Sequence, residues 1–378
     1  MKKMALVILV FALLAGSVSA AEPEIKGKSA ILMDAATGTI LCEQNIHQAL
    51  APASVTKVMT MLLIMEAIDD GRIGWEDTVT ASEAAAAKGG SQVYLKVGET
   101  MTVADMVKSI AVSSANDCAC AMAEHIAGSE AAFVERMNAR AAELGMHDTH
   151  FVNCTGLDDD ASAKDHKTSA HDIAIMSREL LVNHPDIRKY TTIWMDTIRE
   201  GAFGLSNTNK MVRYYPGCTG LKTGFTAAAG YCLSASAERD GMELIAVVMG
   251  AETSQDRFST CKSLLDHGFA NYALYEPVVQ EGASVPVTLG KADSVAAMPE
   301  NDTRLLVEKA MKNSITAEVT LEASAEAPVA QGQRLGTLTV RAGDEILAEV
   351  PLVAQSAVEK LSFGDLMGRV LRKVAMAK

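Results

Sequence analysis

The pattern of apolar and polar residues divides the chain into two parts. Between residues 25 and 275, strand-like segments stand at both ends, and segments with a helical period lie between them. Segments 29–34 and 38–42 predict a β-hairpin, and the apolar run 55–65 predicts a buried helix. Strands from both ends of one segment, with helices between them, are typical of an α/β sandwich.

Further elements of this part follow from periodicity and turn residues. Helices are predicted over 105–110, 117–126 and 130–144. Segments 222–236 and 242–249 predict two adjacent strands joined by a turn at 238–241. A last helix is predicted over 255–268, with Gly268 as its C-terminal cap.

The pattern changes after about residue 275. Segments 285–289, 315–321 and 337–341 alternate apolar and polar residues, and Gly and Pro separate them. Helical periods fade over the same region. We therefore predict a small all-β domain over 276–355.

Both ends of the chain have a composition of their own. Two early lysines, an apolar stretch 4–15 and small residues up to Ala20 predict a signal peptide over 1–20, cleaved after Ala20 or Ala21. Over 358–378, apolar residues fall on one face of a predicted helix, while basic residues lie largely elsewhere. The apolar residues are Phe363, Leu366, Met367, Val370, Leu371 and Val374. This pattern favours an in-plane membrane anchor over a terminal helix docked on its own domain.

Composition limits the partners and the compartment. The chain has 378 residues and a net charge of −13, which disfavours nucleic acid as a partner. Its seven cysteines are an odd number and show no C-x-x-C or zinc-like spacing. We interpret them as buried small side chains in preference to a disulfide framework. With the signal peptide and anchor, the predicted location is the outer face of the cytoplasmic membrane.

Ser54 and Lys57 stand at the start of the apolar helix. Their spacing places a hydroxyl and an amine on one helical face, one turn apart. A serine becomes a nucleophile when a base removes its proton, and a lysine can be that base if burial or a nearby cation keeps it neutral. Ser54 is also predicted to be the N-cap of the helix.

Two further motifs follow this pair. Ser114 and Asn116 form a Ser-x-Asn sequence, and 222–224 reads Lys-Thr-Gly on a predicted strand. Each motif alone is weak, and a second Ser-x-x-Lys at 259–262 is interpreted as a surface helix. The three motifs together, in this order, are typical of the penicillin-recognising serine enzymes. Lys222 is then a candidate for the cation beside Lys57.

At these residues the chain resembles the serine-type D-Ala-D-Ala carboxypeptidases. This low-molecular-mass penicillin-binding protein family includes sporulation-associated members. The resemblance extends over 144–153, 156–158, 168–174 and 327–333. It implies a penicillin-binding protein/β-lactamase-like sandwich with an antiparallel sheet over 25–275, followed by the all-β domain and the amphipathic helix.

The same resemblance implies an activity and catalytic roles. The enzyme would remove the terminal D-alanine from peptidoglycan pentapeptides and would bind β-lactam antibiotics covalently, without a metal or cofactor. Ser54 would be the acyl-ester nucleophile, Lys57 its base and Ser114 a proton shuttle to the leaving amine. Asn116 would orient the substrate amide.

The remaining site residues would bind the substrate's end. By resemblance, Lys222 and Thr223 of the Lys-Thr-Gly motif, which Gly224 completes, hold the terminal carboxylate. Arg257 is a possible helper. The oxyanion hole would consist of the backbone N–H groups of Ser54 and Phe225.

Three other functions compete with this one. A class A-like β-lactamase would share the motifs, but no Glu-x-x-Leu-Asn-like segment lies between residues 116 and 222, and Glu179 falls in a predicted helix. A non-catalytic cell-wall-binding protein would not need all three motifs intact. A metal hydrolase would have to use His147, His150, His166 or His171, which we interpret as solvated loop residues.

Overall fold

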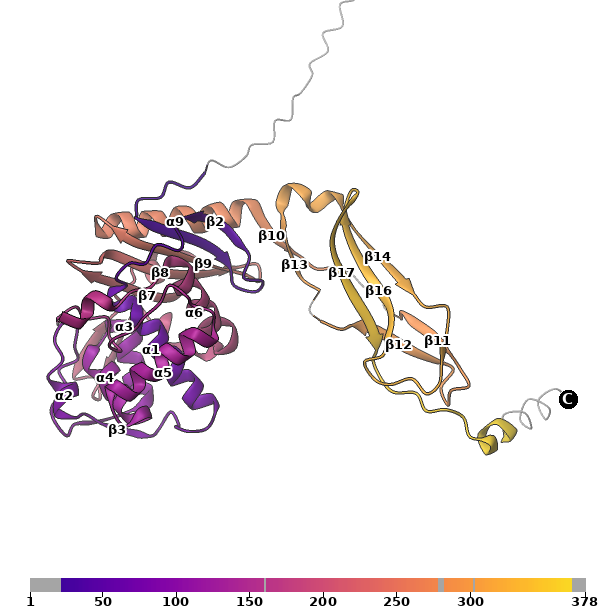
Figure 1. Ribbon diagram of the computed structural model, residues 1–378, viewed down its shortest axis with the longest axis horizontal. Coiled ribbons are helices and arrows are strands. Elements are labelled where there is room, and N and C mark those ends of the chain that lie inside the picture. Colours follow the sequence, from indigo (N-terminus) through magenta and orange to yellow (C-terminus); the bar gives the residue numbers. More distant parts are fainter. Residues whose placement is uncertain (1–21, 160, 278–281, 302, 369–378) are drawn as a thin grey trace, which may run out of the picture.

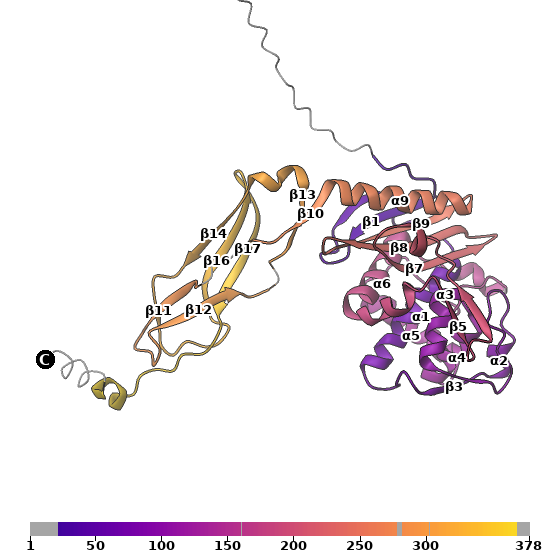
Figure 2. The same cartoon turned by 180° about the vertical axis from the view of Figure 1, so that it is seen from behind.

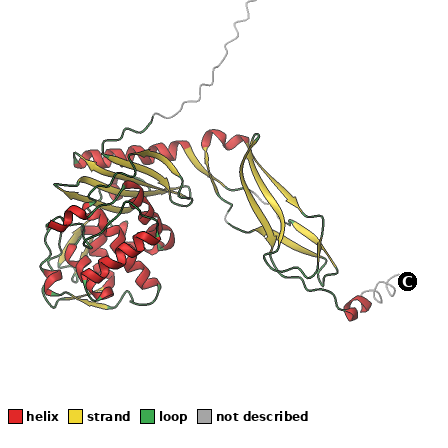
Figure 3. Ribbon diagram, in the orientation of Figure 1, coloured by secondary structure: helices red, strands yellow, loops and turns green. Residues whose placement is uncertain are grey.

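The computed structural model describes residues 22–159, 161–277, 282–301 and 303–368. Figure 1 shows an N-terminal part in which helices cover a sheet, and a C-terminal part built mainly from strands. Figure 3 shows the same division by secondary structure. The predicted fold class, an α/β sandwich followed by an all-β domain, is confirmed.

Five antiparallel strands form the central sheet, in the order β2-β1-β9-β8-β7. Their bounds are Ser29–Asp34 (β1), Ile40–Gln44 (β2), Cys218–Thr226 (β7), Gly230–Arg239 (β8) and Met242–Ala251 (β9). The predicted first hairpin is β1 with β2, and β1 also pairs with β9. The two ends of this part therefore meet in one sheet, and β7 lies at its edge.

Helices cover both faces of the sheet, as the two opposite views show (Figures 1 and 2). The helix α9 lies on one face, and α1, α3, α4, α5 and α6 lie on the opposite side. Their bounds are Lys57–Asp69 (α1), Val103–Ser113 (α3), Asn116–Ala127 (α4), Glu130–Glu143 (α5), Ala170–Asn183 (α6) and Ser254–Asn271 (α9). Successive strand residues face opposite sides, so β1 sends Ile31 to the core around α1 and Leu32 to the core beneath α9.

Two predicted element boundaries are wrong. The segment 222–236 is not one strand, because residues 227–229 turn the chain from β7 into β8. Gly268 is not a cap, since α9 continues to Asn271. A Cβ at position 268 would lie 2.4 Å from Leu244 Cδ1 and 3.0 Å from Leu32 Cδ2. This glycine lets the helix pack closely on the sheet, a requirement that local sequence does not reveal.

Short elements connect the main ones. Strands β3 and β4 pair with each other, as do β5 and β6. The bounds are Thr78–Thr80 (β3), Glu83–Ala86 (α2), Thr100–Thr102 (β4), Arg188–Thr191 (α7), Met195–Ile198 (β5), Phe203–Ser206 (β6) and Met211–Tyr214 (α8).

The C-terminal part is built around a six-stranded sheet in the order β14-β16-β17-β12-β11-β15, while β10 pairs with β13. The bounds are Tyr272–Tyr275 (β10), Ser284–Thr288 (β11), Ser294–Pro299 (β12), Leu305–Glu308 (β13), Ile315–Leu321 (β14), Ala325–Glu326 (β15), Arg334–Ala342 (β16) and Glu345–Ala354 (β17). Val285 and Val287 are buried while their neighbours in β11 are exposed, as the alternation predicts. The six-residue 3₁₀ helix Lys309–Ser314 was not predicted from the sequence.

Much of the predicted targeting sequence lies outside the described residues. This applies to the whole signal peptide 1–20 and to residues 369–378 of the predicted anchor. Residues 363–368 are helical, and Phe363 is 78% exposed. Within the described ranges, no helix has the length and apolar character needed to cross a membrane.

Candidate active site

The nucleophile segment is one turn of 3₁₀ helix, Ala53–Thr56, followed directly by α1. Ser54 lies inside this turn and Pro52 occupies the cap position, so the prediction that Ser54 is an N-cap is wrong. The expected juxtaposition is nevertheless present. Nζ of Lys57 lies 3.0 Å from Oγ of Ser54.

Lys57 is fully buried, and its amine has one further partner. Nζ donates to the backbone carbonyl of Thr155 at 2.8 Å. Burial lowers the pKa of Lys57 to about 7, although Cys154 and Asp117 act in the opposite direction. A lysine with this pKa is largely neutral at slightly alkaline pH and is suited to general base catalysis. Of the two causes that the sequence suggested, burial and a nearby cation, burial is the one that lowers the pKa of Lys57.

The second motif lies where α3 ends and α4 begins. Ser114 is buried and adopts a left-handed conformation, with φ 63° and ψ 30°. Nδ2 of Asn116 donates to the carbonyl of Gly89 at 2.7 Å. Within the described chain, Oγ of Ser114 and Oδ1 of Asn116 are buried and have no hydrogen-bond partner. Buried polar atoms normally have partners, so these two atoms mark a place where a ligand can bind.

The third motif brings the edge strand β7 against the nucleophile. A Cβ at Gly224 would lie 2.6 Å from the carbonyl O of Pro52 and 3.1 Å from the backbone N of Ser54. Only glycine permits this approach of two backbones. The side chain of Phe225 is 53% exposed and lies against Tyr231, with ring centroids 4.3 Å apart. The backbone of β7 is therefore adjacent to Ser54.

Lys222 is fully buried on β7. Its Nζ donates to the carbonyl of Thr223 at 2.8 Å. Burial, followed by the charges of Lys57 and Arg257, lowers the pKa of Lys222 well below its usual range. The sequence suggested Lys222 as a cation beside Lys57. Its ammonium form is disfavoured unless an anion lies beside it.

Arg257 reaches β7 from α9, on the sheet face opposite α1. It donates to the carbonyls of Gly224 at 2.9 Å and of Cys232 at 3.4 Å. Its guanidinium also lies over the ring of Tyr231. The buried Nε has no hydrogen-bond partner among the described residues. Arg257 supports the backbone of the Lys-Thr-Gly strand and adds positive charge near Lys222.

Thr208 joins the second motif to the third. Its N–H donates to the carbonyl of Val112, two residues before Ser114, at 3.1 Å. Its hydroxyl accepts from Thr223 at 2.7 Å. Together with the contact of Gly224 with the nucleophile turn, this places all three motifs around one site.

His166 is a site residue that sequence reasoning missed. It is buried and not a solvated loop histidine as interpreted, whereas His147 and His150 are exposed. Its Nδ1 accepts the N–H of Val152 at 3.2 Å, so the neutral ring carries its proton on Nε2. Nε2 lies 2.8 Å from the hydroxyl of Thr56, which donates to the carbonyl of Ala53 at 2.8 Å. This chain of bonds holds the turn that carries Ser54.

The burial of His166 predicts a pH-dependent stability. Burial lowers the pKa of His166 from 6.5 to about 4, so the unfolded chain binds this proton at a higher pH than the folded one. Stability is then fully present above pH 6.5 and falls as the pH drops to 4, by about 3 kcal/mol for this shift. Urea unfolding from pH 4 to 7 tests this. His166→Gln, whose amide replaces the Nε2 donor, should make the free energy of unfolding less dependent on pH. An unchanged pH dependence in this variant would contradict the role of His166.

Two other contributions had no clear signal in the sequence. Thr155 acts through its backbone carbonyl, and its loop is shaped by Asn153, whose side-chain oxygen accepts the N–H of Gly156 at 2.7 Å. Asp117 is buried and accepts the N–H groups of Val93 and Leu95 at 3.1 and 3.0 Å. These bonds fix the segment that leads into the second motif.

A profile of the family described as D-alanyl-D-alanine carboxypeptidase matches residues 16–253. The chain belongs to this family. A second profile, the C-terminal domain of penicillin-binding protein 5, matches residues 275–360. The assignment made from three short motifs is confirmed, and the carboxypeptidase is an enzyme of the serine peptidase type.

Relatives and solved structures agree with this assignment. The carboxypeptidase is 42% identical to D-alanyl-D-alanine carboxypeptidase DacF of Bacillus subtilis over 92% of this chain and 89% of the relative. It is 34% identical to DacD of Escherichia coli over 92% and 90%. Penicillin binding protein 5 of Haemophilus influenzae superposes with a TM-score of 0.76 at 31% identity, covering 90% of this chain and 99% of that one.

The residues that the competing functions would need are engaged elsewhere. Glu179 lies in α6 and binds Arg140 at 2.6 Å, so it is not placed as a β-lactamase water-activating base. In the described part of the chain, one cluster has metal-ligand spacing: Glu66, Glu179 and His184. Arg140 also binds Glu66 at 2.7 Å, so both carboxylates of the cluster are already paired with its guanidinium.

Proposed function

We propose that Ser54 attacks the carbonyl of the penultimate D-alanine of a peptidoglycan stem peptide. The observation that carries this mechanism is the 3.0 Å contact between the fully buried amine of Lys57 and the half-buried Ser54. A neutral amine has two N–H donors and one lone pair. One N–H is directed to Thr155, so the lone pair is available for the proton of Ser54.

The attack forms an acyl-enzyme and releases D-alanine. Ser114 lies at the end of α3 with an unpartnered hydroxyl, which suits it to pass a proton to the leaving amine. The free Oδ1 of Asn116 can accept the N–H of the substrate amide. Water then hydrolyses the ester, and Ser54 is regenerated. β-Lactam antibiotics would acylate the same hydroxyl.

Two backbone N–H groups are proposed to stabilise the tetrahedral oxyanion. A Cβ at Gly224 would lie 3.1 Å from the backbone N of Ser54, and this close approach of the two backbones supports a pairing of the N–H of Ser54 with the next N–H along β7, that of Phe225. Donors already fixed in position stabilise charge that develops in the transition state. The side chain of Phe225 is not required for this role.

The substrate carboxylate is proposed to bind Lys222 and Thr223, with Arg257 behind them. An anion beside Lys222 offsets the burial that lowers the pKa of Lys222, so substrate binding would be accompanied by protonation of this lysine. The enzyme would thereby recognise a free peptide end and not an internal peptide bond.

Lys222→Gln tests this recognition. We expect kcat/KM for a diacetyl-Lys-D-Ala-D-Ala peptide to fall about 100-fold, because a buried charge pair is lost. The same peptide with a C-terminal amide should be cleaved equally slowly by the wild type and the variant. Lys262→Gln, in the exposed second Ser-x-x-Lys, is the matched control and should be unaffected. A 100-fold loss with the amide peptide as well would contradict carboxylate recognition.

One assay separates the proposed activity from its alternatives. The purified protein is incubated with the diacetyl-Lys-D-Ala-D-Ala peptide, and free D-alanine is measured with and without penicillin. We expect D-alanine release that penicillin blocks over many turnovers. Rapid penicillin hydrolysis would indicate a β-lactamase, and neither reaction would indicate a wall-binding protein.

We further propose that the chain is exported and held at the outer face of the cytoplasmic membrane. In this proposal, residues 1–20 are a signal peptide, 25–275 and 276–355 are the two domains, and 358–378 is an in-plane anchor. The exposed apolar side chains Phe363, Leu366 and Met367 support the anchor. A chain that ends at Val358 should lose binding to anionic vesicles; equal binding would contradict the anchor.

A further inference from the structure

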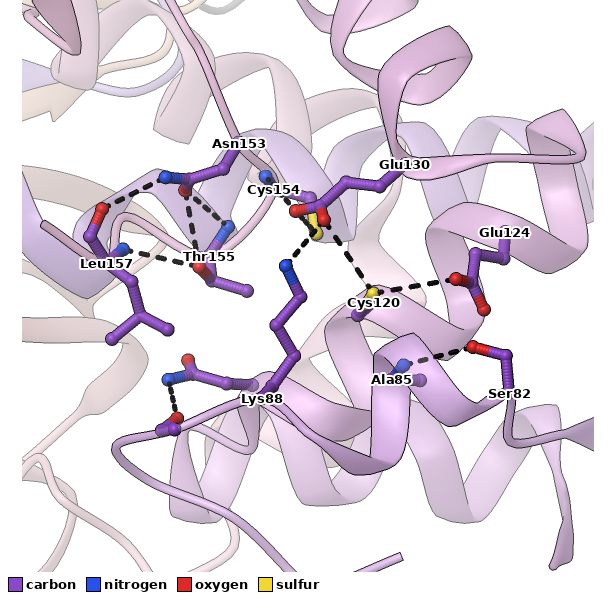
Figure 4. Close-up of polar contacts among 12 residues, drawn as sticks. Ser82, Ala85, Lys88, Cys120, Glu124, Glu130, Asn153, Cys154, Thr155 and Leu157 are labelled. Carbon is purple, nitrogen blue, oxygen red and sulfur yellow. Dashed lines mark hydrogen bonds and ion pairs between the residues drawn. The ribbon is translucent and has the colours of Figure 1, made fainter. Parts of the chain in front are cut away.

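Two cysteines from distant parts of the chain lie together behind the active site. Cys120 is on α4, and Cys154 begins the loop that continues with Thr155. Both side chains are fully buried. Sγ of Cys154 lies 3.2 Å from Oε1 of Glu130, and Sγ of Cys120 lies 3.8 Å from Oε2. Figure 4 shows both thiols and Lys88 converging on Glu130.

The two thiols share one acceptor, the carboxylate of Glu130. The pKa of the Cys154 thiol is raised well above its usual range, first by its hydrogen bond with Cys120 and then by burial. Two thiols held at one carboxylate are close neighbours, and a disulfide can form from such a pair when the side chains rotate toward each other.

This cysteine pair is adjacent to the catalytic base. The carbonyl of Cys154 accepts the hydroxyl of Thr60 on α1 at 2.6 Å, and the next carbonyl, of Thr155, accepts Lys57. The helix that carries Cys120 begins at Asn116. A covalent bond between the two sulfurs would therefore tie the loop that holds Lys57 to the helix of the second motif.

We propose that Cys120 and Cys154 form a disulfide when the protein meets a disulfide oxidant. One thiolate attacks the oxidant R–S–S–R and releases one R–SH, and the second thiolate attacks the mixed disulfide and releases another. Two protein S–H bonds and one oxidant S–S bond are lost, while one protein S–S bond and two R–SH form. The oxidant receives two electrons, and the two protons end on its thiols.

The surroundings tolerate this cross-link. Glu130 loses two thiol donors but keeps Lys88, whose Nζ lies 2.6 Å from Oε2. Glu130 therefore keeps a partner on each oxygen, because Cys154 also keeps its backbone N–H bond to Oε1. The half-buried Glu124 loses only its 3.9 Å contact with Cys120. The cross-link restricts the unfolded chain and should raise Tm by at least about 5 °C.

The full chain is tested in buffers with a graded ratio of oxidised to reduced glutathione, both by incubating folded protein and by refolding. Proteins are denatured, alkylated and mapped by mass spectrometry. We expect a linked pair of peptides containing Cys120 and Cys154, and the Tm increase. Cys120→Ala and Cys154→Ala should each abolish both effects. Cys261→Ala, at a buried cysteine of α9 on the other face of the sheet, is the matched control and should retain them.

The proposal would be overturned if both cysteines were fully alkylated after incubation of the folded protein and also after refolding. It would also be overturned if Cys120 and Cys154 were linked only to other cysteines. The mapping of wild-type protein does not depend on whether the variants fold. It also does not depend on D-alanine release, so its failure and the failure of the proposed function can be distinguished.

Discussion

Ser54→Ala is expected to abolish covalent labelling by fluorescent penicillin and to lower D-alanine release by at least about 10⁴-fold. Loss of a catalytic nucleophile removes the acyl-enzyme route, and only binding and oxyanion stabilisation remain. The replacement is small and lies in the turn Ala53–Thr56, so folding should be retained. Gel fluorescence after labelling and an assay of free D-alanine measure the two effects.

The chain provides a matched control for this variant. Ser259 is exposed on α9 and starts the second Ser-x-x-Lys sequence, which has no partner motifs. Ser259→Ala should label and release D-alanine as the wild type does. Undiminished labelling of Ser54→Ala would move the nucleophile elsewhere and would remove the basis of the proposed mechanism.

Lys57→Arg is expected to lower the rate of acylation about 10³-fold and to change its pH dependence. In the wild type the acylation rate should rise as the pH increases through about 7, since burial lowers the pKa of Lys57 to that value and the neutral form is the base. Arginine remains protonated over this range and cannot accept the proton of Ser54. Stopped-flow acylation from pH 5 to 9 measures both effects.

Lys262→Arg serves as the control for the same substitution at an exposed site and should keep the wild-type profile. Thermal unfolding shows whether Lys57→Arg folds. If it does not fold, the smaller replacement Lys57→Gln is used in the same measurement. Lys57 would be excluded as the base if the acylation rate of the wild type did not change around pH 7. It would also be excluded if the arginine variant kept the rise of the acylation rate with pH.

Local features of the sequence were sufficient for the elements and the reaction class. The apolar run 55–65 is helical because every face of it is buried, and the alternation in β11 reflects a half-buried strand. The errors concern packing and turns: Gly268 looked like a cap because a glycine near a helix end often is one. Its actual role depends on Leu244, which lies on a different strand.

The site residues also divide into those that a local motif reveals and those that depend on tertiary packing. Ser54, Lys57, Ser114 and Lys222 were found from three short motifs and from their resemblance to a known family, because a motif is a local pattern. His166 was set aside, since its partner Thr56 is remote in sequence. Thr155 was missed because its contribution is a backbone carbonyl, which any residue type carries.

By itself, the sequence determined which chemical groups the protein has and in which order they occur, and this was enough to identify acyl transfer on a serine. The tertiary structure decided their protonation and their neighbours: a Lys57 with a pKa near 7, a Lys222 that needs an anion, and two cysteines that share the carboxylate of Glu130. The physical reason is that the cost of burying a charge depends on everything packed around it, and those surroundings come from segments far apart along the chain.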